Sequence, residues 1–135
     1  MTGPDSRSIT QMPGIDEREA AKLRRVGIVT VDDLWAHAGD HAGRREVSAA
    51  TGIASQRLAR WARRAELMQV PSIGPRQAAL LELSGVTSLK QLRQRNPESL
   101  LESMAEANRT HRLLDHLPDP ELASEWVRSA DRIAV

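Results

Sequence analysis

The residues most capable of chemistry in this 135-residue chain form a proline- and glycine-containing turn in its second half. Residues 70–78 read Val-Pro-Ser-Ile-Gly-Pro-Arg-Gln-Ala. The Gly-Pro pair marks the start of a helix, where unpaired backbone N–H groups carry a partial positive charge and can hold an anion such as phosphate. The candidate anion-binding residues of this turn are Ser72, Ile73, Gly74 and Arg76.

Three arginines at helical spacing precede this turn. Arg57, Arg60 and Arg64 fall on one face of a helix that we predict to begin at Ser55. A basic edge of this kind can follow a phosphate backbone. The competing interpretation is a solvated face whose charges pair with nearby carboxylates, which is the usual meaning of a charge run. Both interpretations stay open at the level of sequence.

A related turn lies in the first half of the chain, where residues 12–16 read Met-Pro-Gly-Ile-Asp. Gly14 joins the candidate binding residues because glycine accepts positive φ and lets a ligand approach the backbone closely. Asp16 can instead satisfy the helix start with its own carboxylate, and it would repel a phosphate. We therefore favour the second turn as the binding site. In the alternative, both turns serve only packing, with Ile15 and Ile73 in the core.

The two turns belong to an internal repeat. A shift of 58 residues places residues 12–34 over residues 70–92 without a gap, and a shift of 65 places residues 61–65 over residues 126–130. The second copy therefore carries a short insertion within residues 109–119. We expect a flexible N-terminal segment over residues 1–11, a first unit over residues 12–69 and a second unit over residues 70–135.

Capping residues and hydrophobic periodicity predict about four short helices in each copy. Apolar residues recur at spacings of three and four, and long β-branched runs are missing. Asp16 with Glu19 forms a capping-box pattern, and Gly27 ends that helix. The other predicted N-caps are Thr30, Ser88, Asn96 and Asp119. Residues predicted to be buried on the two late helices are Leu58, Trp61, Ala62, Ala65 and Met68, and then Leu122, Trp126, Ala130 and Ile133.

Composition limits the class of protein. Nineteen basic and eighteen acidic residues leave a net charge of +1, which argues against the strong positive field of an avid nucleic-acid binder. The chain has no cysteine, so it has no disulfide framework and no thiolate nucleophile. No apolar stretch is long enough to cross a membrane. We expect a soluble, cytoplasmic protein with no membrane partner.

The second turn resembles the helix-hairpin-helix motif. Over residues 12–134, the order of hairpin, Gly-Ile/Val-x-Thr/Ser turn, Asn-Pro helix start and late tryptophan resembles a bacterial domain-of-unknown-function family built of tandem helix-hairpin-helix-like modules. The resemblance implies an all-α fold of two such units packed as one compact domain. The wider motif class implies binding of duplex DNA without sequence preference. Ser72 and Asp16 depart from the two-glycine pattern of that class.

Enzymatic interpretations have little support in the sequence. His37 and His41 are spaced to bind zinc on a helix, but Gly39 interrupts that helix, and a surface role for both is more common. The chain shows no nucleophile elbow, phosphate loop or dinucleotide fingerprint. We predict no catalytic residue, no metal and no cofactor.

Two functions of different class follow from these residues. The first is a non-catalytic module that binds the nucleic-acid backbone through the second turn and the arginine edge. The alternative is an adaptor that docks onto another protein through apolar surface near Trp35 or Trp126, with purely structural turns. An enzyme or a small-molecule binder that uses a cleft between the two units is a distant third. The sequence does not give the oligomeric state.

Overall fold

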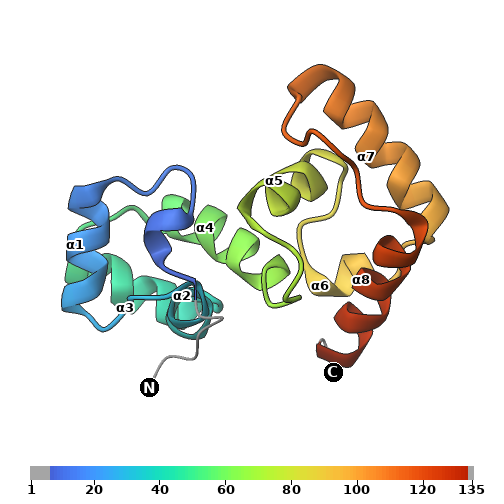
Figure 1. The fold of residues 1–135 in the computed structure, drawn as a ribbon. Coiled ribbons are helices and arrows are strands. Elements are labelled where there is room, and N and C mark those ends of the chain that lie inside the picture. Colours follow the sequence, from blue (N-terminus) through green and yellow to red (C-terminus); the bar gives the residue numbers. More distant parts are fainter. Residues whose placement is uncertain (1–6, 134–135) are drawn as a thin grey trace. The chain divides into compact units, whose positions relative to one another are not determined.

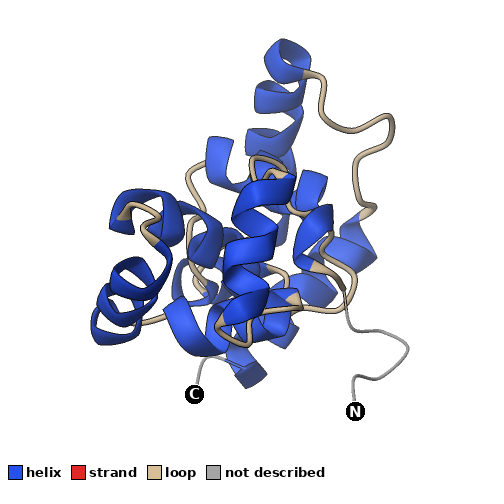
Figure 2. Ribbon diagram, turned by 90° about the vertical axis from the view of Figure 1, so that its left-hand side faces the viewer, coloured by secondary structure: helices blue, strands red, loops and turns tan. Residues whose placement is uncertain are grey.

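The computed structural model describes residues 7–133, and every regular element in that range is a helix, apart from one isolated β-bridge between Ser8 and Thr30 (Figures 1 and 2). The predicted all-α fold class is confirmed. The chain divides into two compact units, Met1–Glu66 and Leu67–Val135, slightly earlier than the expected boundary after residue 69. None of the helices within residues 7–133 has the length and apolar character needed to cross a membrane.

The first unit begins with a 3-10 turn, η1, followed by four α-helices. Helices α2 and α3 pack on each other, and α1 contacts both α3 and η1. The apolar face of α4 is buried as the hydrophobic periodicity predicts, with Leu58, Trp61 and Ala65 at most 3% exposed. The elements are η1 (Ile9–Gln11), α1 (Glu17–Arg25), α2 (Val31–Ala38), α3 (His41–Thr51) and α4 (Ser55–Leu67).

Residues 7–11 lie within the part of the chain that we expected to be flexible, whereas residues 1–6 lie outside the described residues. Ile9 is fully buried, and its backbone N–H donates to the carbonyl of Val29. The N–H of Val31 in turn donates to the carbonyl of Arg7. The structure therefore fixes residues 7–11 against the turn before α2 by backbone hydrogen bonds and by burial of an isoleucine.

The second unit consists of four α-helices. Helix α8 packs against both α6 and α7, and α5 packs against α7. Trp126 on α8 is 1% exposed and Ala130 is fully buried, as predicted, but Leu122 is only half-buried. Ile133 was predicted to be buried and is 36% exposed, because it lies in the final turn of the helix. The helices are α5 (Pro75–Leu83), α6 (Leu89–Arg93), α7 (Pro97–His111) and α8 (Pro120–Ile133).

The predicted caps hold most of the helix starts. Asp16 and Glu19 form the expected capping box, and Thr30 forms a second one with Asp33. Side chains of Ser88 and Asn96 accept backbone N–H groups in the first turns of α6 and α7. Asp119 accepts the N–H of Leu122 in the same way at α8. These local interactions fix where each helix begins.

Helices α1 and α5 are both nine residues long and start 58 positions apart, the same spacing as the sequence repeat. Helix α8 starts 65 positions after α4. The longer second spacing coincides with the connection between α7 and α8. In that connection the Asn108 side chain holds Leu114 at both backbone groups, with its Nδ2 donating to the carbonyl and its Oδ1 accepting the N–H.

Candidate nucleic-acid interface

The second hairpin, residues 70–76, is a tight turn anchored in the core. The N–H of Ile73 donates to the carbonyl of Val70 at 3.0 Å, and the Ile73 side chain is fully buried. Ile73 therefore serves as the anchor of the turn, and its side chain is not available to a ligand. Ile73 is one of the four candidates of this hairpin, and it has the buried position that the packing interpretation predicts.

Ser72 has an internal partner. Its Oγ accepts a 2.8 Å hydrogen bond from the indole Nε1 of Trp126, which ties α8 to the hairpin. Ser72 itself is exposed. A hydroxyl has one donor and two acceptor positions, so Ser72 keeps its O–H proton available to a ligand. The structure thus leaves Ser72 as a donor whose position is fixed by Trp126.

The start of α5 has no side-chain cap on its first-turn N–H groups. Gly74 occupies the N-cap position and lacks a side chain to accept them. The Gln77 side chain satisfies only the N–H of Gly74 itself, through a 3.1 Å bond to Oε1. Arg76, in the first turn, is exposed and forms no hydrogen bond or ion pair within residues 7–133. The helix start and a free cation therefore lie together.

The first hairpin, residues 12–16, ends on a closed helix start. Gly14 has a φ of 94°, which glycine accepts readily, and it allows the turn that Ile15 closes by donating to Met12. Asp16 Oδ1 accepts the N–H of Glu19 at 2.8 Å. The carboxylate therefore occupies the position that a bound phosphate would need, as we predicted.

Arg57 is committed to the first hairpin and is not part of a free basic edge. Its guanidinium donates to both carboxylate oxygens of Glu19, at 3.0 and 2.9 Å, and to the carbonyl of Gly14 at 3.1 Å. It also lies over the ring of Trp61, 5.1 Å from the centroid. Arg57 is therefore held by Glu19 and by the Gly14 carbonyl, and a phosphate would have to compete with these partners for its guanidinium.

The other two arginines of the predicted edge differ from each other. Arg60 is exposed and forms no hydrogen bond or ion pair with the described residues. Arg64 is half-buried and has an interaction within the chain. Of the three arginines on this face of α4, Arg60 is the one without a hydrogen-bond or ion-pair partner among the described residues.

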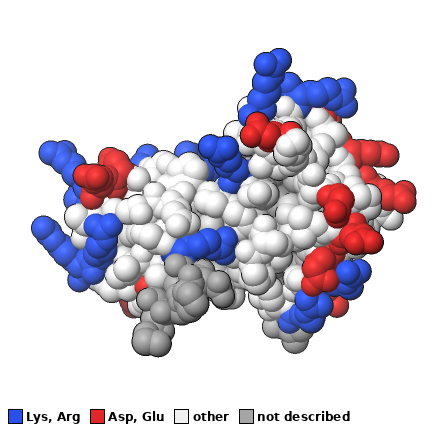
Figure 3. All heavy atoms as spheres, in the orientation of Figure 1, with Lys and Arg blue, Asp and Glu red and all other residues white. Residues whose placement is uncertain are grey.

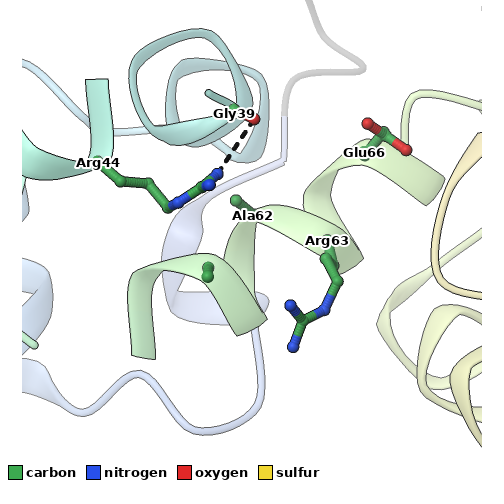
Figure 4. A pocket seen from close by; sticks show the side chains of 6 residues that line it. Gly39, Arg44, Ala62, Arg63 and Glu66 are labelled. Carbon is green, nitrogen blue, oxygen red and sulfur yellow. Dashed lines mark hydrogen bonds between the residues drawn. The ribbon is translucent and has the colours of Figure 1, made fainter. Parts of the chain in front are cut away.

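A shallow hollow of about 250 Å³ lies beside α4 in the first unit (Figure 4). Arg44 reaches across it and donates to the carbonyls of Ala38 and Gly39, which close the C-terminal end of α2. Arg63 and Glu66 line the α4 side of the hollow. Because Arg44 is held by helix carbonyls, this hollow is a helix-capping arrangement rather than a cluster of free cations.

The charge distribution in Figure 3 matches the small net charge. Basic and acidic side chains are interleaved over the first unit, and acidic side chains gather along the α7 side of the second unit. Glu98, Glu102 and Glu106 are all exposed on α7 at spacings of four. This helix face would repel a phosphate backbone. The exposed glutamate face of α7 is therefore unsuited to nucleic-acid contact.

The two closely spaced histidines, His37 and His41, are separated by a break between helices. Gly39 is the C-cap of α2 and Asp40 is the N-cap of α3, so His37 and His41 lie on different helices. Among residues 7–133 there is no group of three or more histidine, cysteine, aspartate or glutamate residues that could hold a metal ion. The expected interruption of the helix at Gly39 is confirmed.

Comparison with known proteins gives one match. Residues 13–133 fit the sequence profile of a family described as Domain of unknown function (DUF4332). The chain belongs to this family. No curated protein and no solved structure matches it significantly. The expected resemblance to a domain-of-unknown-function family is confirmed at that level, and the role of this DUF4332 chain has to be argued from its residues.

Two contacts in the DUF4332 chain were not predicted from the sequence. Glu19 was assigned only a capping role, yet it also holds Arg57, which lies 38 positions further along the chain. The bond between Trp126 and Ser72 spans 54 positions. The sequence repeat does match the residues involved, because it aligns Gly14 with Ser72 and Trp61 with Trp126. In the structure the late tryptophan lies beside the hairpin in each unit, because Trp126 bonds to Ser72 and Trp61 Nε1 lies 3.5 Å from where a Cβ on Gly14 would be.

Proposed function

We propose that this DUF4332 chain binds the backbone of duplex DNA, without reading base sequence, through the second hairpin. The observation that supports this proposal is the start of α5, where first-turn N–H groups without a side-chain cap lie beside the exposed and unpaired Arg76. A phosphate oxygen is the ligand that such a helix start favours. The resemblance of the hairpin to the helix-hairpin-helix motif supports the same ligand.

The comparison of the two hairpins sharpens the proposal. Arg18 and Arg76 are each the second residue of their helices, α1 and α5, and both are exposed. Arg18 lies beside a helix start that is closed by the Asp16 carboxylate, whereas Arg76 lies beside an uncapped one. A phosphate would therefore bind at Arg76 and not at Arg18.

Binding of this kind is weak and depends strongly on salt. Backbone contacts release counterions, so the affinity falls with a log–log slope of about 0.9 for each phosphate neutralised. The net charge of +1 supplies little long-range attraction. We expect a dissociation constant of about 10⁻⁵ M at low salt, within the usual range of non-specific binding. Arg60 is the residue of the first unit that can add to it.

The test is fluorescence anisotropy of the full chain with a duplex of random sequence, about 20 base pairs long, at about 50 and 200 mM salt. Arg76→Ala should weaken binding about fivefold on every sequence and lower the salt slope by about one unit. Arg18→Ala is the matched control and should leave both quantities unchanged. Equal effects of the two substitutions, or no binding at low salt, would overturn the proposal.

The adaptor alternative concerns apolar surface near Trp35 or Trp126, and the two tryptophans differ in exposure. Trp126 is 1% exposed, and its indole N–H is bonded to Ser72, so it offers no apolar surface to a partner. Trp35 is half-buried. Binding of a protein and not of duplex would direct attention to the surface around Trp35.

A further inference from the structure

The second unit contains a small hollow beside the second hairpin. It has a volume of about 160 Å³. Its walls come from the second hairpin, the first turn of α5, the connection between α7 and α8, and α8 itself. The lining residues are Ser72, Gln77, Leu114, His116, Leu117, Pro118, Leu122 and Trp126.

Two of the lining residues have hydrogen-bond donors left over, because their acceptor atoms are already engaged. The Oγ of Ser72 accepts the indole N–H of Trp126, which leaves the hydroxyl proton for another partner. The Oε1 of Gln77 accepts the N–H of Gly74, which leaves the Nε2 amide protons. Neither donor has another partner among residues 7–133. The imidazole N–H of His116 adds a third donor.

The rest of the lining is apolar. Leu114, Leu117 and Leu122 are half-buried, as are Gln77 and Pro118. The Asn108 side chain fixes the backbone of Leu114 at both its N–H and its carbonyl, so this wall is held in place. The hollow therefore joins a group of donors to an apolar wall, as small-molecule sites do, but its volume is below the roughly 300 Å³ at which such sites usually begin.

Charge and size define the ligand. The lining contains no lysine or arginine, so a dianionic phosphate would find no cation to balance its charge there. One water occupies about 30 Å³ of liquid, so the hollow has room for a ligand of about five to seven non-hydrogen atoms. A carboxylate carries a single charge and two oxygens that can accept from Ser72 and Gln77 together.

We propose that this hollow binds a small carboxylic acid with a branched apolar tail, the carboxylate on Ser72 and Gln77 and the tail against Leu114, Leu117 and Leu122. The hollow shares Ser72 with the second hairpin, whereas the DNA-binding proposal rests on Arg76 and the first-turn amides of α5. The two tests can therefore fail separately.

The experiment is a titration of the ¹⁵N-labelled full chain with 3-methylbutanoate, followed by two-dimensional NMR. The chain has three tryptophans, so its spectrum contains three indole N–H signals that report on different places. The Trp126 indole and the Gln77 side-chain amide should shift saturably, with a dissociation constant of about 1 mM. The Trp61 and Trp35 indole signals are internal controls and should not move.

Two variants and two further ligands make the test decisive. Gln77→Glu keeps an oxygen for the N–H of Gly74 but replaces the amide donor by a carboxylate, and we expect at least a tenfold loss of affinity, about that of one hydrogen bond to a charged group. Arg76→Ala should leave the titration unchanged. The neutral 3-methylbutanamide should bind more weakly than the acid. The proposal is overturned if no saturable shift appears, if Gln77→Glu binds as well as the wild type, or if inorganic phosphate produces the same shifts as the acid.

Discussion

The indole N–H of Trp126 lies 2.8 Å from the hydroxyl oxygen of Ser72 and donates a hydrogen bond to it. Trp126 is 1% exposed, so its only polar atom is satisfied within the unit rather than by bulk water. The first unit has a related arrangement with a different outcome. There the corresponding indole nitrogen, Nε1 of Trp61, lies 3.5 Å from where a Cβ on Gly14 would be, and glycine has no side chain to accept it.

The bond between Trp126 and Ser72 should contribute measurably to the stability of the chain. We expect Ser72→Ala to lower the free energy of unfolding by about 1 kcal/mol, because it leaves a donor of a buried tryptophan without its partner. A double-mutant cycle with Trp126→Phe separates this bond from the packing lost with the indole. Urea denaturation of the four proteins measures the coupling. A coupling energy of zero would contradict the assignment.

Gly74→Asp should weaken DNA binding without weakening the fold. Gly74 has the extended backbone of an N-cap, with φ of −90° and ψ of −178°, so aspartate fits there and can accept first-turn N–H groups as Asp16 does in α1. The Gln77 side chain must move slightly to make room for the new Cβ. We expect stability to rise by about 0.3 kcal/mol while the affinity for duplex falls. Thermal melting and anisotropy measure the two effects.

If Gly74→Asp bound duplex as tightly as the wild type, the amides at the start of α5 would not be the binding site. The matched change in the other unit is Asp16→Gly. It removes a carboxylate from the start of α1, so it should lower stability by a few tenths of a kcal/mol, roughly the difference between these two caps.

Glu19 has two separable roles, in the capping box and in the contact with Arg57. Glu19→Gln keeps an oxygen for the N–H of Asp16 but removes the charge that pairs with Arg57. We expect it to cost about 0.5 kcal/mol, because the Arg57 side chain is 48% exposed and its charge is screened by water. Glu19→Ala loses both roles and should cost about 1 to 2 kcal/mol.

Salt provides the control for this pair of variants. The cost of Glu19→Gln should shrink in about 1 M NaCl, where the Debye length is about 3 Å, since that cost is mainly electrostatic. The additional cost of Glu19→Ala should persist, because it comes from a lost cap. Urea denaturation at low and high salt measures both. A salt-independent cost of Glu19→Gln would show that the ion pair adds nothing to stability.

The carboxylate of Asp33 should make the first unit sensitive to acid. Burial acts to raise its pKa, but hydrogen bonds from the Val29 and Thr30 amides and from the Thr30 hydroxyl, together with the charge of His37, lower the pKa below its usual range. A carboxyl group with a lowered pKa in the folded state stabilises the fold above its unfolded pKa of about 3.9, and this contribution is lost as the pH falls through the folded value.

Asp33→Asn removes this titration. We therefore expect the stability difference between wild type and Asp33→Asn to be largest near neutral pH and to narrow below about pH 4. Urea denaturation of both proteins across this range measures the difference, and the subtraction removes the other carboxyl groups that titrate in both. A difference that stays constant with pH would contradict the role of the charge.

The sequence predicted the features that depend on near neighbours in the chain. The caps at Asp16, Thr30, Ser88 and Asn96 are set by residues two to four positions away, and each is found where the pattern placed it. Periodicity likewise located the buried face of α4, because the helix itself brings those residues together.

The candidate site was predicted less completely, for a physical reason. Whether an arginine is free depends on which carboxylate the fold brings to it, and Glu19 reaches Arg57 only through tertiary structure. The position of Ser72 against Trp126 is a contact of the same kind. A basic residue in a sequence shows that a charge is present, whereas its availability is decided by packing between distant segments.

The closed start of α1 has a consequence for how the protein would assemble on DNA. A chain with two open hairpins could hold two separate duplexes at once and draw them into a cross-linked network. The Asp16 and Glu19 carboxylates exclude the first hairpin from that task. If the second hairpin binds as proposed, each molecule occupies one duplex, and added protein coats the DNA rather than condensing it.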